Sequence, residues 1–108
     1  MTAITMFCKK DTNQFIGFSI KGHAGYSNYG NDIVCCAIST IAINVQNSIE
    51  SFCEDCKFKQ DVSKDGEMYF ELLNSSHDTD VLLNSANLGF HEIAKQYKKF
   101  VTVKIKEV

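Results

Sequence analysis

The sequence predicts an α+β domain in which two helices pack on one face of a mainly antiparallel sheet. Two observations predict this class. Apolar residues recur at every second position in five segments, and at every third or fourth position in two others. The segments follow one another in the order ββαββαβ. One sheet and two helices that bury their apolar sides against each other form a two-layer sandwich.

The first two strands are predicted to form a hairpin. In the segment Ala3–Lys10 the apolar residues Ile4, Met6 and Cys8 fall at period two. After the polar stretch "DTNQ", the segment Phe15–Lys21 alternates again. A strand, a short polar turn and a second strand are therefore expected.

A helix of about five to six turns is predicted from Asp32 onward. Asn31 or Asp32 is the expected N-cap, which places Cys35 in the first turn. The side chain of Cys36 points about 100° away from that of Cys35, and we assign it to packing. The apolar residues that step by three or four along this helix are Val34, Ile38, Ile41, Val45, Ile49 and Phe52.

The second half of the chain has the same succession of patterns. "KFKQDVSKDGEMYFELL" has two alternating runs around Lys64-Asp65-Gly66, and Asp-Gly is a strong hairpin signal. A second helix with Ser76 or Asp78 as N-cap follows, and "FVTVKIKEV" alternates as the last strand. The pattern does not specify the order of the strands in the sheet. The apolar stripe of the second helix is Leu82, Ala86, Phe90, Ile93 and Tyr97.

Length and composition predict a single domain over residues 1–108. The chain has 108 residues, of which 44% are hydrophobic and 22% charged, and a second core would need roughly 50 residues more. Five cysteines and the lack of a signal-peptide pattern indicate a cytoplasmic protein with reduced thiols. No uninterrupted apolar stretch approaches the roughly 18 to 20 residues that span a bilayer, so no membrane association is expected.

The charge pattern does not predict a nucleic-acid partner. A formal net charge of -2 gives no general attraction to nucleic acid, and no aromatic-basic motif accompanies the lysines. We therefore expect no direct nucleic-acid binding. The lysines near the C-terminus are assigned to a solvated face: Lys95, Lys98, Lys99, Lys104 and Lys106. The acidic Glu50, Glu54 and Asp55 are assigned to a solvated helix end.

The stretch "GHAGYSNYGNDIVCCAIST" contains a candidate nucleophile and a candidate base. A thiol in the first turn of a helix is activated by the positive end of the helix dipole, and the free amides there could bind an oxyanion. His23 precedes Cys35 by twelve residues, across a loop that contains Gly25 and Gly30. Its imidazole could take the thiol proton as a general base.

Each of these residues also has a structural interpretation. Asp32 or Ser39 could orient the pair, but Asp32 could simply cap the helix and Ser39 could bond back to a backbone carbonyl. Cys35 could be a small buried apolar residue, and His23 could be an exposed residue at a strand end. The spacing alone leaves both interpretations open.

The pair Cys53 and Cys56 is a weak candidate for a metal or redox site. Two cysteines three positions apart can share a metal ion or a disulfide, but no second cysteine or histidine pair has a suitable spacing. We therefore expect no metal and no cofactor.

The stretch from Gly22 to Ser39 resembles the ribosomal-processing cysteine protease family, called Prp and formerly grouped with YsxB-like proteins. The pattern is Gly-His-Ala, a short loop, Gly-x-Asp-Ile-Val-Cys and a helix start with small residues and a serine. Cys36 departs from it, because many members have alanine there. The matching residues are Gly22, His23, Ala24, Gly30, Asp32, Ile33, Val34, Cys35 and Ser39.

The resemblance implies a cysteine endopeptidase that removes a short N-terminal extension from a large-subunit ribosomal protein, in support of ribosome assembly. It implies Cys35 as the nucleophile and His23 as the base, with Asp32 and Ser39 as supporting positions. It also implies a homodimer. The alternative is a non-catalytic, ribosome-associated binding module in which Cys35 only packs.

The residues around the histidine are candidates for a substrate loop, namely Gly22, Tyr26 and Tyr29. Substrates of the resembling family place a bulky apolar residue just before the cleaved bond. Two tyrosines in a lid between base and nucleophile could shape an apolar pocket for it. Exposed tyrosines that never touch substrate are the equally simple interpretation.

Overall fold

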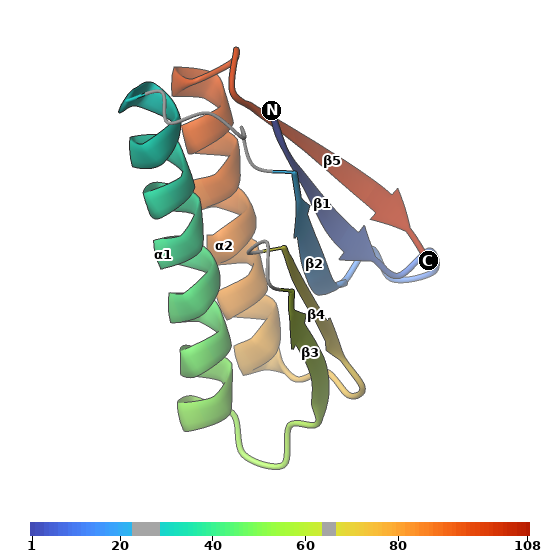
Figure 1. The fold of residues 1–108 in the computed structure, drawn as a ribbon. Coiled ribbons are helices and arrows are strands. Elements are labelled where there is room, and N and C mark those ends of the chain that lie inside the picture. The colour runs from blue at the N-terminus through green and yellow to red at the C-terminus, as the bar shows by residue number, and fades with distance from the viewer. Residues whose placement is uncertain (23–28, 64–66) are drawn as a thin grey trace.

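The computed structural model describes residues 1–22, 29–63 and 67–108, with the backbone alone for residues 29–32. The order ββαββαβ is confirmed (Figure 1). The Lys64-Asp65-Gly66 turn lies outside the described residues, but the strands on either side of it pair antiparallel as predicted. The elements are β1 (Thr2–Cys8), β2 (Phe15–Lys21), α1 (Tyr29–Phe52), β3 (Phe58–Val62), β4 (Met68–Leu72), α2 (His77–Gln96) and β5 (Val101–Glu107).

The five strands form one sheet in the order β3-β4-β2-β1-β5. All neighbours pair antiparallel except β1 and β5, which are parallel. Both helices lie on the same face of the sheet (Figure 1). The predicted α+β sandwich is therefore confirmed. Its strand order could not be predicted, because a period of two identifies a strand but not its neighbours.

Three phenylalanines hold the two layers together. Phe18 on β2 stacks on Phe70 of β4 with ring centroids 5.6 Å apart. Phe90 of α2 meets Phe18 edge-on, also at 5.6 Å, and all three side chains are fully buried. Each such side chain stabilises the fold by about 1.5–3 kcal/mol. Because the helices cover this face, the opposite face of the sheet is left to solvent.

Helix α1 begins earlier than predicted. Its first residue is Tyr29, so the prediction that Asn31 or Asp32 caps the helix is wrong. The apolar stripe marks only where the helix meets the core, at Val34, and carries no information about the turn before it. An aspartate such as Asp32 in the first turn is favoured by the helix dipole, so its position is compatible with a helix that has already begun.

The buried line of α1 also differs from the predicted stripe at its end. Phe52 is 72% exposed, whereas Cys53 is 7% exposed. The line advances from Ile49 by four residues, so Phe52 lies about 100° away from it. In the middle of the helix, Ala42 is fully buried and Ile41 only partly so.

The predicted start of α2 is confirmed at Ser76. The Thr79 amide donates to the Ser76 hydroxyl oxygen at 3.2 Å, and the Ser76 amide donates to the Thr79 hydroxyl oxygen at 2.8 Å. This reciprocal pair forms a capping box, and the other candidate, Asp78, lies in the first turn. The buried residues are Thr79, Leu83, Ala86 and Phe90, whereas the predicted Leu82, Ile93 and Tyr97 are partly buried.

The segment Ile33–Phe52 of α1 is long and apolar enough to cross a membrane, with a mean hydropathy of 1.3. The expectation that no stretch approaches this length was based on uninterrupted apolar runs, which polar residues break. The mean hydropathy averages over those polar residues and therefore identifies the whole segment. The core helix of a globular protein passes the same test. In this fold Val34, Ile38 and Ile49 pack in the common core, which accounts for part of the hydropathy of α1, since 33% of the segment is buried.

Candidate active site

The strand β2 ends at the same end of the molecule at which α1 begins (Figure 1). Gly22, the residue after β2, has a φ of 67°, a left-handed conformation that disfavours any residue with a Cβ. A Cβ there would lie 2.9 Å from the Met1 carbonyl oxygen. The position therefore requires glycine. The next residue, His23, lies outside the described residues.

Glu67 anchors the chain where it leaves β2. Its Oε2 accepts a hydrogen bond from the Gly22 amide at 2.9 Å. Glu67 is itself held by Ser63, whose amide donates to the Glu67 carbonyl at 2.8 Å and whose Oγ accepts from the Glu67 amide at 3.1 Å. Sequence analysis missed Glu67, which is 45 residues from Gly22, because the pairing of β2 with β4 was not predictable.

Cys35 lies at the edge of the buried line of α1. It follows Val34, which is 1% exposed, and is itself half-buried. Cys36 is exposed, so its assignment to packing is wrong. One step of about 100° around the helix carries its side chain past the edge of the core. Cys35 is thus partly accessible and partly held by the core.

The early start of α1 changes the expected environment of Cys35. Cys35 is the seventh residue of the helix, about 9 Å along the axis from the first. Amides that deep in a helix bond to the carbonyl four residues before them, and the dipole effect falls off within the first turn. The prediction that Cys35 lies in the first turn of the helix is therefore wrong, and its position no longer supports activation of the thiol by the helix terminus.

The other three cysteines are poor nucleophiles. Burial raises the pKa of the thiols of Cys8, Cys53 and Cys56. Glu107 adds to the effect at Cys8, and Asp78 adds to it at Cys53. Because the thiolate is the reactive form, the two remaining cysteines on α1 are the candidates. Among the described residues, no group of three or more His, Cys, Asp or Glu side chains could hold a metal ion.

The other predicted site residues are only partly placed. Ser39 is exposed, one turn after Cys35. The bond back to the preceding turn is made by its neighbour Thr40, whose hydroxyl donates to the Cys36 carbonyl at 2.8 Å. Asp32 and Tyr29 belong to α1 by their backbone, whereas Tyr26 lies outside the part of the chain that the structure describes. The described structure thus brings together only Cys35 and Ser39 of the predicted set.

The fold is shared with solved bacterial structures. The structure of SMU.848 from Streptococcus mutans is 30% identical, with a TM-score of 0.86 over 100% of this chain and 96% of that one. The essential ribosomal processing protease Prp from S. aureus, in complex with a substrate peptide, is 18% identical, with a TM-score of 0.87 over 98% and 100% of the two chains. Its complex with a covalently linked product peptide gives a TM-score of 0.85.

None of the curated proteins matches the chain. The family model described as cysteine protease Prp, however, matches residues 1–102. This range includes both helices, the motif around His23 and Cys35, the strands β1 to β4 and the first two residues of β5. The chain therefore belongs to the Prp family of cysteine proteases.

Proposed function

We propose that Cys35 is the nucleophile and His23 the general base of a peptidase that removes a short N-terminal extension from a large-subunit ribosomal protein. The observation that carries this proposal is the family match over residues 1–102, which contains the motif with both residues. The half-buried thiol near the start of α1 supports it, because the chain that leaves β2 toward His23 lies at the same end of the molecule (Figure 1).

The proposed reaction is acyl transfer through a thioester. The His23 imidazole takes the proton of the Cys35 thiol, and the thiolate attacks the carbonyl carbon of the scissile bond. When the tetrahedral intermediate collapses, the C–N bond breaks and the imidazolium gives its proton to the leaving amine. Water then attacks the thioester, loses a proton to His23 and releases the acyl product as the thiol re-forms.

The supporting residues are proposed with narrower roles. Asp32 and Ser39 orient the pair, and Gly22 shapes the turn before the base. Tyr26 and Tyr29 form an apolar pocket for the bulky residue before the cleaved bond. Alanine at both tyrosines should raise KM for a peptide with a bulky apolar residue there, and should affect a peptide with alanine there less. An equal effect on both peptides would remove the pocket role.

The test uses a peptide that carries the N-terminal extension and the first residues of the mature ribosomal protein. Its cleavage is measured by mass spectrometry. Cys35→Ala and His23→Ala should abolish cleavage. The matched controls are the exposed neighbour, Cys36→Ala, and an exposed histidine on α2, His77→Ala, and both should cleave normally. Peptide that stays intact with the wild-type protein, although it binds, would favour a non-catalytic binding module.

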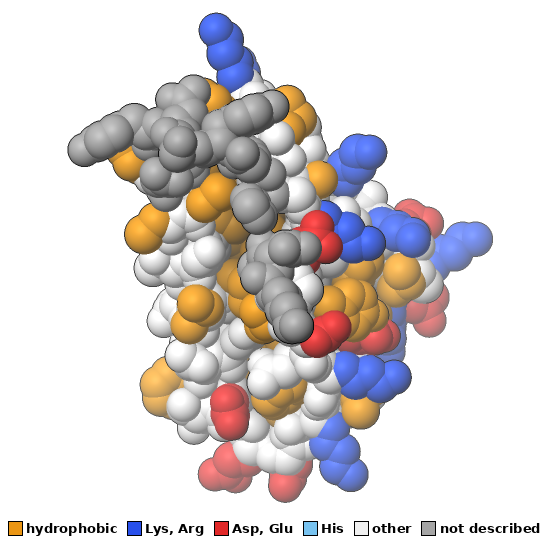
Figure 2. Space-filling model, viewed as in Figure 1, with side chains coloured by type: hydrophobic (Ala, Val, Ile, Leu, Met, Phe, Trp, Pro, Cys, Tyr) orange, Lys and Arg blue, Asp and Glu red, His pale blue; other side chains and the backbone are white. Residues whose placement is uncertain are grey.

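A cytoplasmic homodimer is the proposed state. All five cysteines are free, which suits a reducing compartment. No charged residue lies between Asp32 and Glu50, and Ile33 and Ile43 of α1 are about half exposed, at 52% and 49%. In Figure 2, the side of the molecule formed by α1 is mainly apolar and neutral and has few charged side chains. Such a face suits a second copy of the chain.

Sedimentation equilibrium tests the dimer. Ile43→Asp should shift the protein toward the monomer, whereas the control Val62→Asp, at an exposed apolar residue of β3, should not. A wild-type protein that sediments as a monomer at all concentrations would contradict the proposal.

A further inference from the structure

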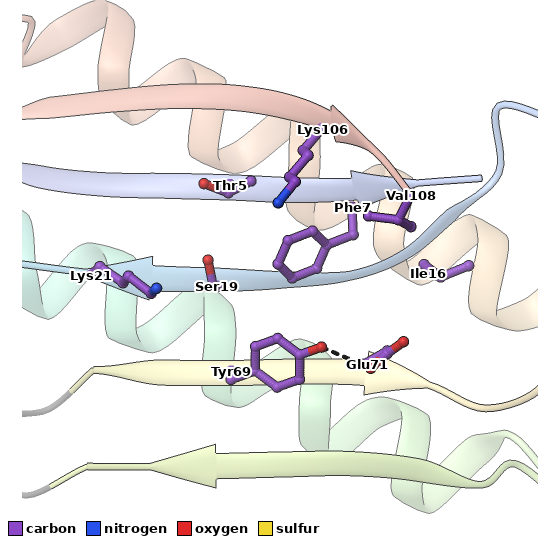
Figure 3. A pocket seen from close by; sticks show the side chains of 9 residues that line it. All are labelled: Thr5, Phe7, Ile16, Ser19, Lys21, Tyr69, Glu71, Lys106 and Val108. Carbon is purple, nitrogen blue, oxygen red and sulfur yellow. Dashed lines mark hydrogen bonds between the residues drawn. The ribbon is translucent and has the colours of Figure 1, made fainter. Parts of the chain in front are cut away.

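The open face of the sheet carries a pair of aromatic rings. Across the strands, Phe7 of β1 pairs with Gly17 of β2, which pairs with Glu71 of β4. The Phe7 ring extends over β2 (Figure 3) and meets Tyr69 of β4. The two ring centroids are 5.6 Å apart at an angle of 50°. Phe7 is half-buried and Tyr69 is 37% exposed.

Lysines surround this pair of rings. The strand register places four on the open face, namely Lys21, Lys59, Lys104 and Lys106, against two carboxylates, Asp61 and Glu71. The rest of the chain has seven basic and eleven acidic residues. Figure 2 shows most of the visible basic side chains on the sheet side, with acidic side chains among them. Positive charge is thus concentrated on one face of an acidic protein.

A hollow of about 390 Å³ lies between the rings and the lysines (Figure 3). Its walls include the hydroxyls of Thr5 and Ser19 and the side chains of Lys21 and Lys106. The Tyr69 hydroxyl donates to Glu71 Oε1 at 2.7 Å, which holds the tyrosine ring in place. Flat apolar surfaces, hydrogen-bonding groups and ammonium groups therefore meet at one place on the sheet.

We propose that this face binds single-stranded RNA. Exposed aromatic rings on a sheet stack bases, and lysines along the same surface hold the phosphates. The Thr5 hydroxyl and the Glu71 carboxylate, both half-buried, offer partners to base edges. An acidic peptide would use the lysines but not the rings. The inference is independent of the proposed peptidase reaction, because it involves neither Cys35 nor His23.

This inference revises the expectation of no direct nucleic-acid binding. That expectation was based on the total charge and on the lack of a local motif. The ring and lysine residues are far apart in the sequence and come from every strand, so only the folded sheet brings them together. The net charge of the whole chain does not show that the open face of the sheet is more basic than the rest of the molecule.

The test is fluorescence anisotropy with a labelled, unstructured RNA of about 12 nucleotides. Tyr69→Ala should weaken binding about tenfold, whereas Tyr69→Phe, which keeps the ring, should bind like the wild type. Lys104→Gln with Lys106→Gln should make the salt dependence shallower by about 1.4 in the log–log slope, or about 0.7 for each phosphate contact. The matched control is Lys98→Gln with Lys99→Gln, two exposed lysines before β5, and it should leave the slope unchanged.

Three results would overturn the proposal. The first is a wild-type protein that does not bind the RNA at about 50 mM salt. The second is an equal loss in the control and the sheet-face variants, which would indicate unspecific attraction to charge. The third is displacement of the RNA by an acidic peptide at equal concentration. All of these are binding readouts, so they stand whether or not the protein cleaves its proposed substrate.

Discussion

The hydrogen bond from Gly22 to Glu67 predicts that the residue just before β4 supports His23, the proposed base, which follows β2. The change is Glu67→Ala, which removes the acceptor of the Gly22 amide at 2.9 Å. A hydrogen bond to a charged group contributes about 1.5–3 kcal/mol. This one is exposed, so about 1 kcal/mol is expected. Since 1.4 kcal/mol corresponds to a factor of ten in an equilibrium constant, the equilibrium between the anchored and the released turn should shift about fivefold toward release.

The assay has two readouts. Hydrogen exchange at the Gly22 amide should become about fivefold faster in Glu67→Ala, because exchange follows the opening of the turn. The kcat/KM for the peptide should fall by at most the same factor, because His23, the proposed base, comes next in the chain. Glu67→Gln keeps an oxygen acceptor and should restore most of both. The control is Glu92→Ala, at an exposed glutamate on α2, which should change neither.

The prediction is refuted if the Gly22 amide exchanges equally fast in Glu67→Ala and in the wild type. A fall in kcat/KM without faster exchange would also contradict it, since the loss would then come through another contact of Glu67. Faster exchange with unchanged kcat/KM would show that the anchor is structural only and does not support catalysis.

In the folded protein at about pH 7.5, alkylation should not modify the three thiols with a raised pKa, namely Cys8, Cys53 and Cys56. Peptide mapping by mass spectrometry measures this. The same shifts predict that the free energy of unfolding falls as the pH rises above about 9, because the unfolded thiols ionise first; urea titrations at several pH values measure this. Gly17→Ala should largely prevent folding, as measured by circular dichroism, because its Cβ would overlap the backbone of Phe70. Gly89→Ala should still fold, because its Cβ would meet only the end of the flexible Ile41 side chain. Phe90→Ala should lower the free energy of unfolding by about 3–5 kcal/mol in urea.

The sequence predicts the elements of this fold well and their neighbours poorly. Alternation and helical period reflect one local quantity, the face of each element that is buried, and this is why all seven elements are found in order. The parallel pairing of β5 with β1 depends on contacts about a hundred residues apart, which no local pattern contains. Even within α1, the pattern located Val34 correctly but misplaced the helix start and Phe52, because neither position is fixed by burial.

The same distinction between local patterns and contacts across the fold applies to the predicted site. The motif identified Cys35, and its half-buried position near the start of a helix is compatible with its proposed role. The position of Cys36 was wrong, because a pattern of small residues does not distinguish the last buried residue from the first exposed one. Glu67 and the sheet face around Tyr69 were missed because their partners come from other strands.

The early start of α1 has a consequence for how this thiol is activated. Six residues of helix separate Cys35 from the helix terminus, and the dipole effect is small beyond the first turn. We therefore expect a peptidase based on this helix to need a separate base, and His23 is the proposed one. If the helix terminus were the activating group, His23→Ala would still allow rapid alkylation of Cys35 at neutral pH. If His23 activates the thiol, the variant should react like an ordinary exposed cysteine, and Cys36 within the same protein provides the reference rate.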